Sequence, residues 1–183
     1  METDRKVGME RAKELFLYYC GNQYYMDLDG DGDEYRSYRV PKEKEEEWRR
    51  EYLDEFFRQE RHGKEALGSY ANAVHFLKSD RSDEDAGRFL YYPLRTKGLD
   101  DATVLFMLRH SYRLAEKWMK KKKFPEEEKK AYLPVLDEYI REVQKRAEEG
   151  TVTRAEGYVL QEFADPAYVA VYLKELRQDW ERL

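Results

Sequence analysis

The sequence predicts an all-α fold, a single bundle of about eight helices with one irregular acidic and aromatic loop after the first helix. Three observations support this prediction. Apolar residues recur every three or four positions through most of the 183-residue chain, which is the period of a helix that buries one face. No segment alternates apolar and polar residues over the length of a strand. Residues that start and stop helices separate the periodic segments at short intervals.

Four helices are expected in the first half of the chain. The first runs to about Cys20, with Val7 on its apolar side. The second follows Pro41, whose ring suits a first helical turn, and covers about residues 42–62. The third covers about residues 64–77. The fourth is short, because Pro93 interrupts its pattern.

The bundle is expected to be organised around the next helix, residues 99–123. Asp100 or Asp101 can cap its first turn, because a carboxylate accepts hydrogen bonds from the free amide groups there. Residues 102–108 are apolar at almost every position, so protein should surround this part on all sides.

Three further helices are expected after it. Pro134 predicts a kink or a split in the first of them. Thr153 and Glu156 have the spacing of a capping box and predict a helix through Phe163. Asp165 and Pro166 predict the start of the last helix. The inward stripe of this last helix is Val169, Tyr172, Leu173, Leu176 and Trp180.

The length predicts one domain over residues 1–183. Residues 40–79 and 124–165 carry a weak internal echo, because LDEFFR at residues 53–58 recurs as LDEYIR at residues 136–141. A duplicated pair of helices joined by glycine would produce this echo. Chance in a sequence rich in Glu, Arg and aromatic residues would produce it as well.

Charge and cysteine content exclude several classes of function. The 34 basic residues are outnumbered by 39 acidic ones, which gives a net charge of −5 and argues against nucleic acid as a partner. The single cysteine, Cys20, excludes an intramolecular disulfide and a thiolate metal cage. Neither a signal peptide nor a membrane span is recognised, so the expected location is the cytoplasm.

The sharpest local motif is the acidic run at residues 27–34, DLDGDGDE. Its aspartates are Asp27, Asp29, Asp31 and Asp33. The first half of this run resembles the calcium loop of an EF-hand, with carboxylates at loop positions one, three and five and a glycine at position six. Position twelve, a glutamate in that family, is Tyr38 here. The resemblance implies a calcium or magnesium site, whereas the alternative is a loop in which Gly and Asp serve as turn residues.

Tyrosines surround this run densely. The candidates for an interaction surface are Tyr18, Tyr24, Tyr25, Tyr35 and Tyr38. A tyrosine offers apolar area with a polar tip, which suits the recognition of other proteins. The alternative is that these rings pack the segment onto the rest of the protein.

A catalytic site has weaker support. His75 and His110 lie outside the HExxH and ExxH arrangements of metal-dependent enzymes, and a catalytic base needs an oriented partner that spacing cannot reveal. The sequence therefore favours a protein-interaction or regulatory module without catalysis and without a bound cofactor, whose partner is another protein or a second copy. A calcium- or magnesium-binding protein is the first alternative. An enzyme or small-ligand-binding bundle that uses His110 or His75 is the second.

Overall fold

The computed structural model describes residues 2–59, 63–79, 83–120 and 126–182. Within these ranges the chain forms nine α-helices and one 3₁₀ helix, and no strand occurs among them, so the all-α prediction is confirmed. The chain divides into two compact units, Met1–Gln59 and Glu60–Leu183, and each is described here by itself. The single domain and the internal duplication both stay predictions.

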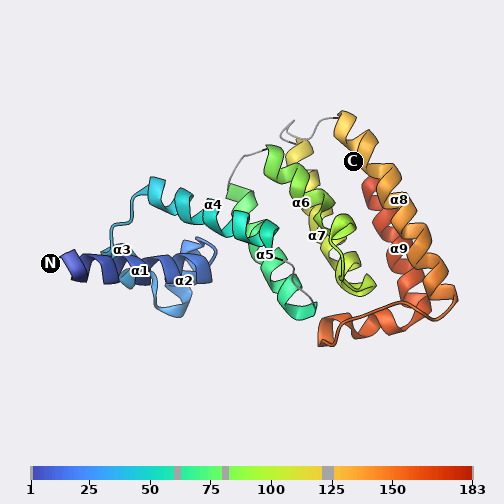
Figure 1. Cartoon of the computed structure of the whole chain (residues 1–183), viewed down its shortest axis with the longest axis horizontal. Coiled ribbons are helices and arrows are strands. Elements are labelled where there is room, and N and C mark those ends of the chain that lie inside the picture. Colours follow the sequence, from blue (N-terminus) through green and yellow to red (C-terminus); the bar gives the residue numbers. More distant parts are fainter. Residues whose placement is uncertain (1, 60–62, 80–82, 121–125, 183) are drawn as a thin grey trace. The chain divides into compact units, whose positions relative to one another are not determined.

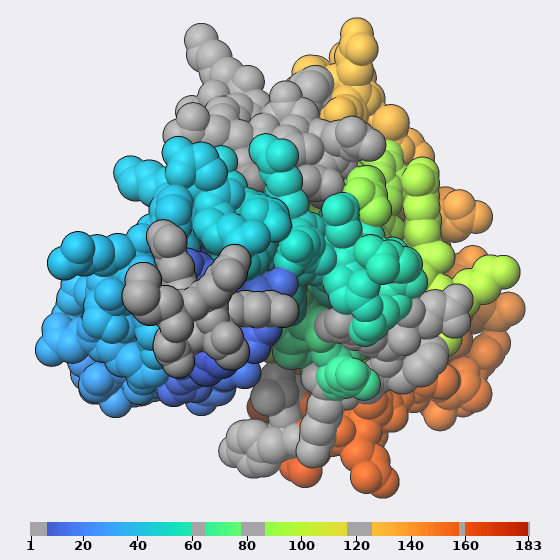
Figure 2. Space-filling view, turned by 60° about the vertical axis from the view of Figure 1, so that its left-hand side comes forward, coloured from blue at the N-terminus to red at the C-terminus, as the bar shows by residue number. Residues whose placement is uncertain are grey.

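The first unit contains four helices. These are α1 (Glu2–Tyr18), α2 (Gln23–Asp29), α3 (Gly32–Ser37) and α4 (Lys42–Arg58). Helix α1 packs against both α3 and α4 (Figure 1). In the space-filling view the light-blue atoms of α3 lie against the darker blue atoms of α1 (Figure 2). The buried apolar residues of this unit are Ala12, Leu15, Phe16, Tyr19, Met26, Tyr35, Trp48, Leu53 and Phe56.

The segment that the sequence predicts as one irregular loop is helical instead, and that prediction is wrong. It forms α2 and α3, which have seven and six residues. The Asn22 side chain caps α2 by accepting a hydrogen bond from the Tyr24 amide at 3.1 Å. Gly30 ends α2 in the left-handed conformation, with φ of 90°, which glycine adopts without steric cost. Neither helix is long enough to produce a readable helical period.

Val7 is also misplaced by the sequence pattern. It is predicted on the buried side of α1, but its side chain is 60% exposed. The first buried position of this helix among the described side chains is Ala12. Among the described side chains of α1, the buried ones begin at Ala12 and lie in the second half of the helix.

The second unit contains the remaining helices. These are α5 (Gly63–Ser79), α6 (Asp83–Arg95), α7 (Asp101–Lys120), α8 (Glu126–Glu148), the 3₁₀ helix η1 (Tyr158–Ala164) and α9 (Pro166–Glu181). Helix α7 contacts α5, α6, α9 and η1, as expected for an organising helix. Figure 1 shows α8 and α9 side by side as an antiparallel pair. Among the described residues no helix has the length and apolarity needed to cross a membrane.

The structure of α7 agrees with the predicted cap at its start and with the predicted burial of residues 102–108. Asp100 caps it, because its carboxylate accepts from the Thr103 amide at 3.0 Å and from the Thr103 hydroxyl at 2.7 Å. Every residue from 102 to 108 is buried except Phe106, which is half-buried. The predicted continuation of α7 to residue 123 extends beyond the described residues. Helix α4 ends at Arg58, and Gln59 after it is extended, so the prediction of a helix to about residue 62 is wrong at residue 59, and residues 60–62 lie outside the described residues.

Pro93 does not interrupt its helix as predicted and Pro134 does not split its helix, whereas the alternative of a kink at Pro134 stays a prediction. Pro93 lies inside α6, which therefore extends to Arg95, and Pro134 lies inside an unbroken α8. A proline removes one backbone hydrogen bond from a helix. Tyr132 and Leu136 on either side of Pro134 are each 1% exposed, and this burial holds α8 against its neighbours across the missing bond.

The capping box predicted at Thr153 and Glu156 is wrong. Residues 151–157 contain no helix, and a 3₁₀ helix follows them. The Thr153 amide and hydroxyl instead donate to the Asp101 carboxylate at 3.0 and 3.1 Å. Asp101 also accepts from Arg146, at 3.1 Å from Nε and 2.7 Å from Nη2. One buried carboxylate thus joins the start of α7, the end of α8 and the segment that follows α8.

Candidate protein-interaction surface

Helix α2 buries one residue and exposes its apolar side chains on the opposite side. Met26 is 1% exposed and anchors the helix in the core of the first unit. Tyr24, Tyr25 and Leu28 are 69%, 49% and 67% exposed. Positions 24 and 28, like positions 25 and 28, lie on one side of a helix because they are four and three residues apart. We call these three side chains the α2 face.

The α2 face lies in the part of the chain where exposed apolar side chains are concentrated. Seven large apolar side chains are exposed among the described residues, and four of them fall between positions 18 and 28. The fourth is Tyr18, the last residue of α1, which is 76% exposed. Single exposed apolar residues are ordinary on a protein surface, so it is their concentration in this segment that makes it the candidate surface.

Two glycines fix the orientation of α2. Gly30 ends the helix, and Gly32 starts α3 in direct contact with α2. A Cβ atom at position 32 would lie 2.9 Å from Cγ and 3.1 Å from Cα of Asp27, closer than ordinary contacts allow. A side chain at position 32 would therefore displace Asp27, and the close approach of α2 and α3 holds the α2 face in place.

The acidic side chains beside the α2 face are held by neighbours from the same unit. Arg36 pairs with Asp27 at 2.5 Å and with Asp33 at 2.6 Å. The Arg36 hydrogen bond to Asp27 holds the pKa of that carboxyl below its usual value. The Tyr19 hydroxyl donates to Asp31 at 2.7 Å, and this bond raises the pKa of Tyr19. Asp29 is the last residue of α2 and is exposed.

This arrangement differs from the calcium loop that the motif resembles. Asp27 and Asp29 lie inside α2, and Arg36 occupies one oxygen each of Asp27 and Asp33. Among the described residues, no group of three or more His, Cys, Asp or Glu side chains is placed to hold a metal ion. Calcium or magnesium binding stays a prediction, and no contact described here supports it.

The five candidate tyrosines separate into two groups. Tyr18, Tyr24 and Tyr25 are exposed, whereas Tyr35 is 7% exposed and donates its hydroxyl hydrogen to Glu45 at 2.6 Å. Burial, together with this bond, raises the pKa of Tyr35. Tyr38 is half-buried and donates to Glu34 at 2.8 Å. The structure thus places three of the five where a partner can reach them.

The two histidines that the structure describes and the cysteine do not form a recognisable catalytic arrangement. The His110 ring is half-buried beside Phe106, with ring centroids 4.9 Å apart, and His75 is exposed on α5. Cys20 is half-buried, and burial raises the pKa of its thiol to about 11. A thiol with so high a pKa is a poor nucleophile at neutral pH.

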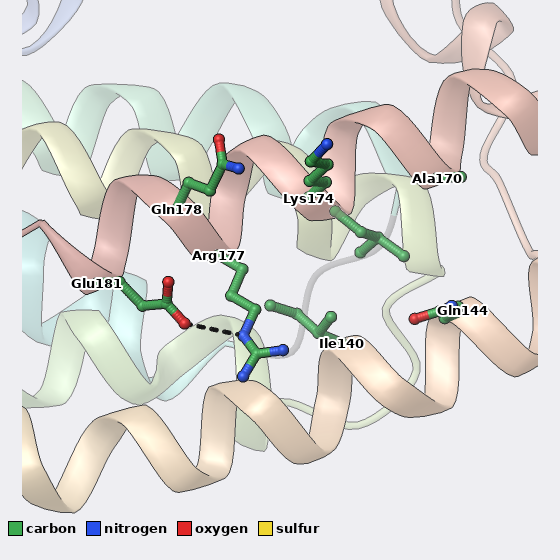
Figure 3. Close-up of a pocket in the computed structure, with 8 residues that line it drawn as sticks. Ile140, Gln144, Ala170, Lys174, Arg177, Gln178 and Glu181 are labelled. Atoms are coloured by element: carbon green, nitrogen blue, oxygen red, sulfur yellow. Dashed lines mark hydrogen bonds and ion pairs between the residues drawn. The ribbon is translucent and has the colours of Figure 1, made fainter.

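Sequence reasoning missed Leu28, the most informative member of the α2 face. The spacing of Tyr24 and Leu28 is a helical one, but it is readable only once residues 23–29 are recognised as a helix. A groove of about 450 Å³ lies between α8 and α9, and Lys174 and Gln178 are among the residues that line it (Figure 3). Sequence reasoning missed this groove as well, because these two residues read as an ordinary polar helix face.

Comparison of the chain with protein-family models, with curated protein sequences and with solved structures gives no match.

Proposed function

We propose that this chain is a protein-binding module without catalysis, and that the α2 face binds a partner segment that carries apolar and basic side chains. The observation that carries the proposal is the exposure of Tyr24, Tyr25 and Leu28 on a helix fixed at both ends. Aromatic residues on a fixed backbone are favoured anchors at interfaces, because they bury a large area while losing little conformational freedom.

The charge of the first unit supports a basic partner. Residues 1–59 hold 16 acidic and 11 basic residues, a net charge of −5, whereas residues 60–183 hold 23 of each. The segment from residue 22 to residue 38 alone has five acidic residues and one basic residue. A basic partner is therefore attracted to this unit and oriented on it.

Each side chain of the α2 face is expected to contribute as much binding free energy as an ordinary anchor residue of a protein interface. Burial of a large apolar side chain contributes roughly 1.5–3 kcal/mol. Truncation of Tyr24 or Leu28 should therefore weaken binding by about 10-fold or more, since 1.4 kcal/mol corresponds to a factor of ten.

A titration with two designed peptides tests the proposal. Both peptides form an amphipathic helix with the same leucine and phenylalanine face, and the remaining positions are lysine in one and glutamate in the other. We expect the lysine peptide to shift the amide NMR signals of residues 22–30 and to bind more weakly at high salt. Tyr24→Ser with Leu28→Ser should abolish these shifts, whereas Val171→Ser, a control at a side chain 57% exposed on α9, should leave them unchanged.

Two results would contradict the proposal. One is equal binding of both peptides by the parent protein, which would remove the role of charge. The other is binding that survives the double substitution. Concentration-dependent association of the protein alone, lost in the double variant, would instead identify a second copy as the partner.

A further inference from the structure

The exposed side chains on and beside α2 are mostly aromatic. Four large apolar side chains are exposed between positions 18 and 28, and three of them are tyrosines. The Tyr24 and Tyr25 rings meet edge to face, with centroids 5.5 Å apart. Neither of their hydroxyl groups makes a hydrogen bond to any residue that the structure describes. A partner that covers these rings must therefore supply hydrogen-bond groups for two hydroxyls, because a hydroxyl that is buried without a partner weakens binding.

The charge next to these rings is negative and is not cancelled by neighbouring cations. Five carboxylates lie at positions 27–34. Arg36 pairs with two of them, and Arg11 pairs with Glu34. The five carboxylates and two guanidinium groups together keep a net charge of −3. A partner that covers the α2 face is therefore bound more tightly if basic residues flank its apolar part.

We propose that the α2 face recognises a proline-rich, basic segment of a partner protein in the polyproline II conformation. This inference rests on the proposed function and names the class of partner. A polyproline II segment has no internal hydrogen bonds, so its carbonyl groups are free to accept. The Tyr24 and Tyr25 hydroxyls donate to these carbonyl groups, while proline rings pack against the tyrosine rings and Leu28. Arginine or lysine beside the prolines pairs with carboxylates of residues 27–34.

Other forms of a partner segment fit this face less well. The carbonyl groups of a helix are already bonded within the helix, so a partner helix offers few acceptors to the tyrosine hydroxyls. A partner strand needs the edge of a sheet, and the described part of the chain contains no strand.

The small size of the face also favours polyproline II. Helix α2 has seven residues and is therefore about 10 Å long, close to one polyproline II turn of about 9 Å. A segment that already has its bound conformation loses less conformational entropy on binding. This advantage matters most where few contacts are available to offset the loss.

Three peptides of equal length test the inference on the whole chain. The first carries prolines in PxxP spacing and three arginines. The second has alanine in place of each proline, and the third has glutamate in place of each arginine. We expect the first peptide to shift the amide NMR signals of residues 22–30 and to bind about 10-fold more tightly than the second. The third peptide should not bind.

Tyr24→Phe with Tyr25→Phe separates the role of the hydroxyls from that of the rings. Loss of two hydrogen bonds should weaken binding of the proline peptide by about 10-fold or more. The lysine peptide of the preceding section should bind this variant as it binds the parent, because both rings remain. The matched control is Tyr91→Phe, which removes the hydroxyl of a half-buried tyrosine on α6 and should change neither affinity.

Two results would overturn the inference while leaving the proposed function in place. One is equal affinity for the proline and alanine peptides, and the other is an affinity for the proline peptide that is unchanged in the double phenylalanine variant. In both cases the lysine peptide would still shift the signals of residues 22–30. If no basic peptide shifts these signals, the proposed function fails, and this inference fails with it.

Discussion

Asp101 is the residue whose replacement should most damage the second unit. Its side chain is 9% exposed and accepts five hydrogen bonds, two from Arg146, two from Thr153 and one from Tyr139 at 3.2 Å. Asp101→Asn keeps the shape of the side chain but removes its charge. The NH₂ group of the asparagine then takes the place of an oxygen that accepts hydrogen bonds, so donor faces donor. Breaking a buried ion pair by changing one partner costs about 3–5 kcal/mol.

The lower end of that range applies here, because the Arg146 side chain is 30% exposed and water can partly replace its partner. We therefore expect Asp101→Asn to lower the free energy of unfolding by about 3 kcal/mol, which corresponds to a fall in Tm of roughly 10 °C. The matched control is Glu142→Gln, which removes the other carboxylate near Arg146, 3.6 Å away and 59% exposed. An exposed pair contributes at most about 1 kcal/mol.

The pH dependence of stability gives a second measurement on the same residue. Burial alone would raise the pKa of Asp101, but the hydrogen bonds from Arg146 and Thr153 outweigh it and hold the pKa below its ordinary value. The contribution of Asp101 to the free energy of unfolding is therefore complete at pH values above the ordinary pKa of an aspartate. It is lost as the pH falls through the lower pKa that Asp101 has in the folded state. Thermal melts between about pH 5 and pH 2 should show a smaller fall in Tm for Asp101→Asn than for the parent. Two results would refute this reasoning. One is a loss of unfolding free energy at pH 7 that is no larger in Asp101→Asn than in Glu142→Gln, and the other is the same change of Tm with pH in Asp101→Asn as in the parent.

Two further predictions concern the first unit. Gly32→Ala should destabilise it by about 1–3 kcal/mol in chemical denaturation, because the new Cβ overlaps Asp27. The control is Gly68→Ala on α5 of the second unit, where the added Cβ lies within 4 Å of no atom beyond its own helical turn, and this substitution should be neutral or stabilising. Equal effects of the two substitutions would contradict the close packing of α2 on α3. The raised pKa of Cys20, about 11 against an ordinary 9.0, predicts alkylation at pH 8 roughly 100-fold slower than in the denatured chain. A rate equal to that of the denatured chain would mean that the thiol is not buried.

The long helices were predictable from the sequence because their apolar stripes repeat over several turns. All five residues of the predicted α9 stripe are buried, and Asp165 caps that helix by accepting from the Ala167 amide at 2.9 Å. Helices α2 and α3 were not predictable, since each has fewer than two full periods. Their glycines and aspartates read as a loop, although Gly30 ends one helix and Gly32 allows the next to start in contact with it.

The candidate surface was predictable only in part. The clustering of tyrosines around residues 18–38 is visible in the sequence, but which rings face water depends on single contacts. Tyr35 turns inward to donate to Glu45, whereas the Tyr24 hydroxyl makes no hydrogen bond to any residue that the structure describes and the ring stays exposed. The groove beside Lys174 was not predictable at all, because it depends on which faces of α8 and α9 meet.

Site-specific photo-crosslinking is the most direct test of the proposed binding at the α2 face. A photoreactive phenylalanine analogue would replace Tyr24 in one variant and Val171 in another, and cells expressing each variant would be irradiated. We expect a discrete protein adduct at position 24, its loss when Leu28→Asp is added, and no such adduct at position 171. The same adducts at both positions, or an adduct at position 24 that persists with Leu28→Asp, would contradict the proposal.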